Sequence, residues 1–285
     1  MPSKSKKFLI SDYNLDATLS SGQSFRWQKI ENCWEGIIGD KWIRLRPNHH
    51  CIIAESSSQQ HNWEWLKKYL QLDFNLNKAI ESFPVDKPMK NALNATPGLR
   101  LLRQDYWETL AAFILSATKQ IVQIQQMVSL LSQRYGKQIA SNGDLPAFTF
   151  PTIDAIADCT ETELRACKLG FRAPNLLQAA RDILDNKINW QKIPLMGSNE
   201  AREELIKLRG VGQKIADCVL LFAGGHQHVF PIDVWIERAL QRLYFTKSKP
   251  SSHQLRNFAD NYFGPFAGLA QQYIFHHARI HLKLK

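Results

Sequence analysis

The chain has 285 residues, 44% of them hydrophobic. This is enough to bury one large core or two ordinary ones, and it excludes a disordered chain. Its 36 lysines and arginines outnumber 26 acidic residues, giving a formal net charge of +10, which favours a polyanionic partner, nucleic acid first, over a neutral metabolite.

No apolar run is long enough to span a bilayer, and too few apolar residues follow the first seven for a secretory signal. We therefore expect an intracellular, soluble protein without a membrane partner. Its compartment would be the cytoplasm or nucleoid in a bacterium and the nucleus in a eukaryote.

The N-terminal part carries a β pattern. Residues 33–38 and 41–46 flank Gly39 and Asp40 like two strands around a tight hairpin turn. Residues 63–70 then have the apolar spacing of an amphipathic helix. A looser stretch through Pro84, Pro88 and Pro97 indicates a connection between two lobes. We place the boundary near Gly98, which gives an N-terminal antiparallel β/α domain over residues 1–98.

Helical patterns dominate residues 99–285. The expected helices cover residues 106–115, 121 to a stop at Gly136, 161–168, 174–184, 199–207, 214–222, 234–244 and 269–282. The polar residues 116–120 separate the first two. A helix end there could present side chains and backbone donors to a ligand, although a solvated junction explains the pattern equally well. The expected fold class is α+β, with a two-lobed helical domain after the sheet.

The most informative stretch is residues 206–218, where Gly210 and Gly212 lie between the end of one helix and the start of another. Glycines permit a backbone with positive φ and a close approach to phosphate, and the second helix offers free N–H groups. The pattern predicts a helix-hairpin-helix that grips the DNA backbone without reading sequence. A simple helix corner remains an alternative. The stretch lacks the third glycine of a dinucleotide-binding fingerprint and does not fit a P-loop.

Two titratable residues near this hairpin are candidates for catalysis. Lys214 is in the first turn of the second helix, where the helix dipole disfavours the ammonium and so favours the nucleophilic amine. Asp233 precedes the next amphipathic helix as an N-cap, and a carboxylate held there could stabilise positive charge on a sugar. The plainer alternatives are a phosphate-binding lysine and a purely structural cap.

The five cysteines include no C-x-x-C pair, so neither a disulfide framework nor a thiolate metal site is indicated. We expect most of them to be small buried side chains.

Four segments together resemble the 8-oxoguanine branch of the helix-hairpin-helix DNA glycosylases. They are residues 21–27, 101–105, 208–218 and 270–275, in the family's order and over nearly the whole chain. The resemblance implies a bifunctional enzyme. In it, the Lys214 amine attacks the sugar C1′, the oxidised guanine leaves, and a Schiff base undergoes β-elimination. Asp233 would assist activation and stabilise the oxocarbenium-like charge, and no metal or organic cofactor is required.

The resemblance also assigns a base pocket. The Gly22 carbonyl would accept the N7–H that 8-oxoguanine has and guanine lacks, and Cys218 and Phe275 would flank the ring. Gln271 would read the base edge. A pocket acceptor left without a donor disfavours normal guanine.

The remaining assignments concern the duplex. Members from eukaryotes have three asparagines where this chain has Thr118, Lys119 and Gln120, and an arginine where Gln123 stands. Since the opposite base is read there, we do not expect strict selectivity for cytosine opposite the lesion.

Phe171 and Arg172 match the Tyr-Arg pair that wedges into the duplex, and Trp235 replaces a histidine of some relatives. The iron–sulfur branches carry four cysteines after the catalytic aspartate, whereas Cys218 is the last cysteine here.

The expected partner is double-stranded DNA with a damaged base, bound by a monomer. Two alternatives remain. One is a glycosylase for another lesion, such as an alkylated purine, and the other is a non-catalytic DNA-binding module. A pure binding module has no need of both Lys214 and Asp233.

Overall fold

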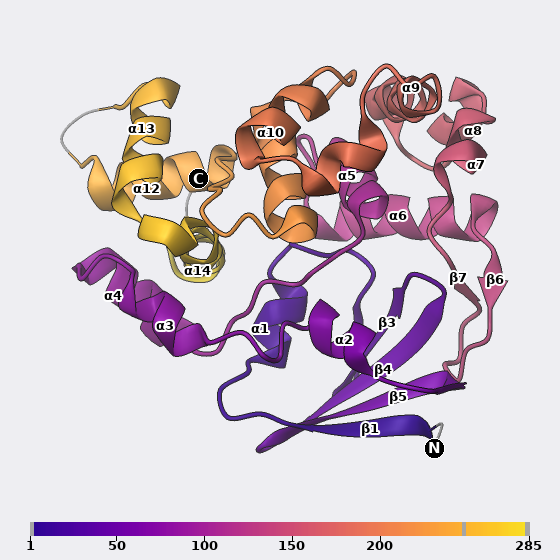
Figure 1. The fold of residues 1–285 in the computed structure, drawn as a ribbon, viewed down its shortest axis with the longest axis horizontal. Coiled ribbons are helices and arrows are strands. Elements are labelled where there is room, and N and C mark those ends of the chain that lie inside the picture. The colour runs from indigo at the N-terminus through magenta and orange to yellow at the C-terminus, as the bar shows by residue number, and fades with distance from the viewer. Residues whose placement is uncertain (1–2, 247–248, 283–285) are drawn as a thin grey trace.

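The computed structural model describes residues 3–246 and 249–282. A five-stranded antiparallel sheet lies beside a larger assembly of helices, and the sheet has the order β1-β5-β4-β3-β2 (Figure 1). The predicted α+β class is confirmed. The strands of this sheet are β1 Ser3–Leu9, β2 Gln28–Ile30, β3 Cys33–Ile38, β4 Lys41–Asn48 and β5 Cys51–Gln60.

The predicted hairpin is confirmed by the register of β3 and β4, in which Ile38 pairs with Lys41 and Trp34 with Leu45. Trp34 and Leu45 are buried, as the two-residue period of a half-buried strand requires. They join Trp27, Ile43 and others in a core under the sheet.

Helices α1 to α4 belong to the first hundred residues, and the others follow. The first four are α1 Leu15–Ser20, α2 Glu64–Tyr69, α3 Leu76–Glu81 and α4 Lys87–Ala95. The next are α5 Tyr106–Leu115, α6 Ile121–Tyr135, α7 Ile153–Ala157, α8 Glu161–Ala166 and α9 Ala173–Leu184, with a small ribbon of β6 Gln138–Ile139 and β7 Ala147–Phe148. The last are α10 Ser198–Ile206, α11 Gln213–Val219, α12 Val234–Tyr244, α13 Ser252–Tyr262 and α14 Ala267–His281, and short single turns are η1 Gly170–Arg172, η2 Trp190–Leu195, η3 Leu220–Gly224 and η4 Gly264–Phe266.

Two expectations need correction. The stretch interpreted as a loose connection contains α4, because Asp86 caps this helix and Pro88 occupies its first turn, where proline is well tolerated, and α3 precedes it. Helix α4 packs against α14. The helix expected over residues 214–222 is α-helical only to Val219 and continues as the π turn η3, whose C-cap Gly225 has φ +72°.

A larger core joins the helices and runs in sequence from Ala17 to Ala278, so α1, α3 and α4 share it with the C-terminal helices. The domain division near Gly98 stays a prediction. Of the helices in the part of the chain that the structure describes, none combines the length and the apolar character needed to cross a membrane.

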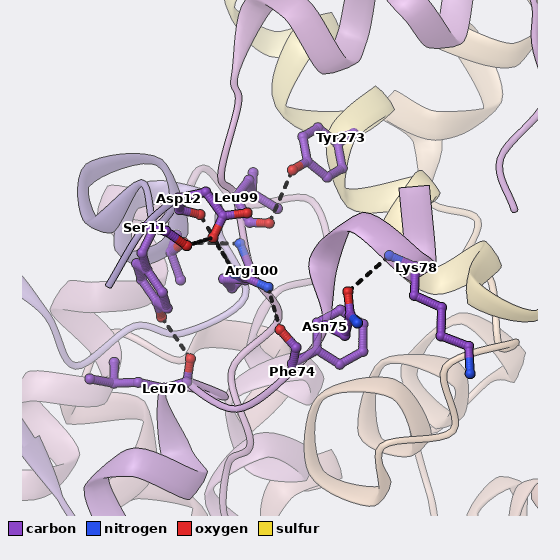
Figure 2. A network of polar contacts seen from close by, with 11 residues as sticks. Ser11, Asp12, Leu70, Phe74, Asn75, Lys78, Leu99, Arg100 and Tyr273 are labelled. Carbon is purple, nitrogen blue, oxygen red and sulfur yellow. Dashed lines mark hydrogen bonds and ion pairs between the residues drawn. The ribbon is translucent and has the colours of Figure 1, made fainter. Parts of the chain in front are cut away.

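Polar contacts fix the N-terminal segment against α14 (Figure 2). The Arg100 guanidinium donates to Asp12 Oδ1 at 2.9 Å and to the Phe74 carbonyl at 2.8 Å. The Tyr273 hydroxyl of α14 donates to the Leu99 carbonyl at 3.2 Å. Since Arg100 is 5% exposed, its charge is desolvated and the pairing holds these segments firmly. The arrangement fixes α14, which carries two of the predicted pocket residues.

Candidate active site

The predicted helix-hairpin-helix is formed by α10 and α11 and the turn between them. Gly210 has φ +79°, and a Cβ built there would lie 2.7 Å from the Asn175 side chain. Gly212 instead caps α11 in an extended conformation, φ −95°, and a Cβ there would meet nothing. Of the two glycines, only Gly210 therefore uses the positive φ that glycine permits. In the first turn of α11 the Ile215 N–H donates to the Gly212 carbonyl at 3.1 Å, and the N–H groups of Gln213 and Lys214 precede any intrahelical acceptor.

As the sequence predicts, Lys214 lies in the first turn of α11, and its side chain is half-buried. Its Nζ donates a hydrogen bond to Ser116 Oγ at 3.1 Å and lies 4.8 Å from the centroid of the Phe113 ring. Both partners come from the C-terminal end of α5. The nucleophile candidate is therefore held between two helices.

Asp233 is the N-cap of α12, and its Oδ1 accepts a hydrogen bond from the Ile236 backbone N–H at 2.8 Å. The predicted capping role is confirmed. Among the described residues, no ion pair within 4 Å joins Asp233 to Lys214, yet the two line one pocket. The capping bond fixes the carboxylate and leaves its second oxygen available to charge developing in that pocket.

The pocket has a volume of about 370 Å³, within the range of small-ligand sites. It gathers every residue that the sequence assigns to catalysis or to the base pocket. Its lining includes Gly22, Lys214, Cys218, Asp233, Gln271 and Phe275.

Gly22 lies in the loop after α1 with φ +80°, and a Cβ there would lie 2.7 Å from Ile121 Cδ1 and 3.5 Å from Phe275 Cε1. Neighbouring amides fix the loop. Gln23 Nε2 donates to the Arg100 carbonyl at 2.8 Å, and Gln272 Nε2 of α14 donates to the Ser21 carbonyl at 3.0 Å. Glycine is thus required here by both conformation and space.

The remaining pocket residues combine apolar surface with one unused amide. Cys218 is 3% exposed, and burial raises the pKa of its thiol to about 12, so the thiol is neutral and behaves as a small apolar side chain. Phe275 is half-buried. Gln271 is 5% exposed, and its Oε1 has no hydrogen-bond partner among the described residues. A buried acceptor without a partner is costly, and a ligand's donor would satisfy it.

The polar junction between α5 and α6 lies at the pocket edge. Thr118 has φ +55°, and Lys119 and Gln120 line the pocket. Gln123 is exposed, and its Oε1 accepts from the Gln120 backbone N–H at 3.2 Å. The structure therefore groups all four near the site.

Phe171 and Arg172 differ in exposure. Phe171 is 59% exposed, whereas Arg172 is 2% exposed and its guanidinium lies 4.1 Å from the Phe171 ring centroid. Arg172 Nε donates to the Ala117 carbonyl at 3.0 Å, and Nη2 donates to Thr118 Oγ1 at 2.9 Å. Arg172 braces the polar junction and supports Phe171, and its guanidinium is not free in this conformation.

Ser116 was not singled out from the sequence. It stood only as one member of the polar stretch, and no local signal links it to a lysine 98 positions away. Trp235, which replaces a histidine of some relatives, is partly exposed beside Asp233 and lines the pocket.

Behind the pocket, Asp217 of α11 is fully buried and pairs with Arg202 Nε of α10 at 2.7 Å and with Arg256 Nη2 of α13 at 3.0 Å. Arg256 also donates to the Phe230 carbonyl at 2.8 Å, three residues before Asp233. The network therefore ties together both segments that carry catalytic candidates.

No cluster of three or more His, Cys, Asp or Glu side chains able to hold a metal occurs within residues 3–246 and 249–282.

Comparisons with known proteins agree with this geometry. Residues 7–110 match the N-terminal domain of 8-oxoguanine DNA glycosylase, and residues 111–265 match the HhH-GPD superfamily base excision DNA repair protein. A probable N-glycosylase/DNA lyase of Methanothermobacter thermautotrophicus is 27% identical, with 95% of both chains covered.

Two solved structures are also similar. One is MBOgg1 in complex with a low-affinity DNA ligand, 32% identical with a TM-score of 0.92, covering 97% of this chain and 96% of that one. The other is Clostridium acetobutylicum 8-oxoguanine glycosylase/lyase with duplex DNA that contains cytosine opposite 8-oxoguanine. It is 29% identical with a TM-score of 0.89, covering 96% and 97% of the two chains.

Proposed function

Because the chain belongs to the HhH-GPD superfamily of base excision DNA repair proteins, we propose that it is a bifunctional DNA glycosylase and AP lyase that removes 8-oxoguanine from duplex DNA. The observation that carries the proposal is the single pocket shared by Lys214, Asp233 and the four residues assigned to the base. A phosphate-binding module alone has no use for such a pocket beside its hairpin.

Lys214 is the nucleophile of the proposed reaction. Its amine attacks C1′ as the glycosidic bond breaks, and the resulting iminium makes β-elimination of the 3′ phosphate possible. Contact with the Phe113 ring and the start of α11 keep the amine in a partly desolvated place. The proposal needs no metal or organic cofactor.

Asp233 stabilises the positive charge that develops on the sugar as the base leaves. The Ile236 N–H bond holds the carboxylate before the reaction starts, so little reorganisation is needed.

The base pocket would distinguish 8-oxoguanine from guanine through its polar atoms. The Gly22 carbonyl would accept N7–H of 8-oxoguanine, and Gln271 would engage the base edge with the oxygen that has no partner in the free protein. Phe275 and the neutral Cys218 would enclose the ring. Guanine would leave the Gly22 acceptor unpaired, which lowers its affinity.

Double-stranded DNA is the partner. The hairpin at Gly210 and Gly212 would hold the backbone, and the exposed Phe171 would fill the space left by the flipped base. Because Gln123 stands where members from eukaryotes have an arginine, we expect that selectivity for cytosine opposite the lesion is not strict. We expect the enzyme to act as a monomer inside the cell.

The test uses duplexes that carry one 8-oxoguanine, paired in turn with each base, and a matched duplex with an alkylated purine. The proposal predicts excision and strand nicking of the 8-oxoguanine duplexes. Excision of the alkylated purine alone would make the enzyme a glycosylase for another lesion. Tight duplex binding with no base release from either substrate would indicate a non-catalytic DNA-binding module.

A further inference from the structure

Ser116 fixes the Lys214 amine through a hydroxyl whose own proton is already used. It caps the C-terminal end of α5, and its Oγ donates a hydrogen bond to the Phe113 carbonyl at 2.7 Å. A serine hydroxyl has one proton and two lone pairs. Because this proton is donated to the Phe113 carbonyl, Oγ can only accept a further hydrogen bond, and it accepts one from Lys214 Nζ at 3.1 Å.

We propose that Ser116 is a positioning residue that orients the lone pair of the Lys214 amine toward the sugar. The inference rests on the proposed function, in which this amine is the nucleophile. A neutral amine has two N–H bonds and one lone pair in a tetrahedral arrangement, so fixing one N–H restricts the lone pair to the remaining directions.

The Phe113 ring further restricts the directions in which the lone pair of the amine can point. Nζ lies 4.8 Å from its centroid, where an N–H or an ammonium is favoured and a lone pair is repelled by the ring face. The ring is itself held by stacking on Phe222, with centroids 5.5 Å apart and planes at 14°. Ser116 and Phe113 thus occupy two directions around Nζ, and the third opens to the pocket that all three residues line.

The covalent step uses this lone pair. The Nζ–C1′ bond forms while the bond between C1′ and N9 breaks, and the electrons of that bond leave with the base. The new secondary ammonium keeps the proton that it donates in a hydrogen bond to Ser116 Oγ. It gives its other proton to the anionic departing base, so that both products are neutral. Ser116 neither gains nor loses a proton and does not touch the base.

The experiment compares wild type with Ser116→Ala, Ser116→Thr and Ser116→Cys. Threonine keeps an oxygen that can bond the carbonyl one turn back, whereas a thiol of similar size is a weak acceptor. Ser82→Ala is the matched control, because Ser82 caps α3 and donates to the Ala79 carbonyl at the same 2.7 Å with no lysine as partner. Single-turnover cleavage of an 8-oxoguanine duplex gives the chemical rate, and binding of a duplex with an uncleavable abasic analogue gives affinity.

We expect Ser116→Ala and Ser116→Cys to lower the single-turnover rate about tenfold to a hundredfold, as misorientation of a reacting group does. Affinity should stay within about twofold, and Ser116→Thr and Ser82→Ala should react at nearly the wild-type rate.

Three results would overturn the inference while leaving the proposed function intact. They are an unchanged rate in Ser116→Ala, an unchanged rate in Ser116→Cys, or a rate loss matched by an equal loss of affinity. A wild-type protein that does not cleave the duplex would instead refute the proposed function itself, and the inference with it.

Discussion

Replacing Gly22 by alanine should slow base excision about a hundredfold without unfolding the protein. With φ +80°, alanine costs roughly 1–2 kcal/mol of backbone strain. At about 2–4 °C per kcal/mol for chains of similar length, the midpoint of thermal unfolding should fall by only a few degrees. The new Cβ would lie 2.7 Å from Ile121 Cδ1, so the Ile121 side chain must move at the pocket wall, whereas the 3.5 Å distance to Phe275 Cε1 is an ordinary contact. A displacement near 1 Å at a reacting site can cost about a hundredfold in rate.

The matched control is Gly39→Ala in the β3–β4 turn. Gly39 also has a positive φ, +59°, but a Cβ there meets nothing within 4 Å. It therefore shares the backbone strain and leaves the pocket untouched. Single-turnover excision of 8-oxoguanine and thermal unfolding are measured for both variants. The reasoning is refuted if Gly22→Ala excises at the wild-type rate, or if Gly39→Ala loses activity to the same extent.

Four further outcomes are expected. Cys218→Ala should leave the positions of both limbs of the pH–rate profile unchanged between pH 6 and 10, because burial holds the pKa of the thiol near 12, and a limb that disappears would contradict this. Asp217→Ala should lower the free energy of unfolding in urea by about 3 kcal/mol, because the half-buried Arg202 and Arg256 lose the buried carboxylate that they share, and a loss below about 1 kcal/mol would disprove that role. Burial lowers the pKa of His276 to about 4, so between pH 6.5 and 4 only the unfolded chain takes up this proton, and the free energy of unfolding falls by up to about 3 kcal/mol. His276→Gln should make the free energy of unfolding depend less steeply on pH in this range, and an unchanged dependence would argue against this role of His276. Phe171→Ala should change the free energy of unfolding by less than about 0.5 kcal/mol but slow excision from paired duplex. Excision at the wild-type rate would show that Phe171 does not act as the wedge.

The elements that the sequence predicted well are those with strong local signals. Helices α5 and α12 have the expected bounds, since an aspartate caps each and apolar residues follow at helical spacing. The hairpin of β3 and β4 follows from alternation around Gly39. Helix α4 was missed although its signal was present, because Pro88 was interpreted as a break instead of a first-turn residue.

The candidate active site could be predicted only in part from local sequence patterns. Lys214 and Asp233 could be proposed from their helix ends, whereas Gly22 and Gln271 meet across about the whole chain length and were placed only by family resemblance. The contacts of Arg172 and Ser116 depend on tertiary packing between distant helices, which no spacing in the sequence encodes. Arg172 matched the DNA wedge by position, and in the structure its guanidinium is buried and donates to the Ala117 carbonyl, so its role in the wedge stays a prediction.

The central claim, that Lys214 forms a Schiff base with the sugar, is tested most directly by borohydride trapping on a duplex with one 8-oxoguanine. Lys119→Gln is the matched control, since Lys119 lines the same pocket. The account predicts a covalent protein–DNA adduct in wild type and Lys119→Gln, mapped to Lys214 by mass spectrometry, and none in Lys214→Gln. An adduct that persists in Lys214→Gln, or base release by wild type without any adduct, would contradict it.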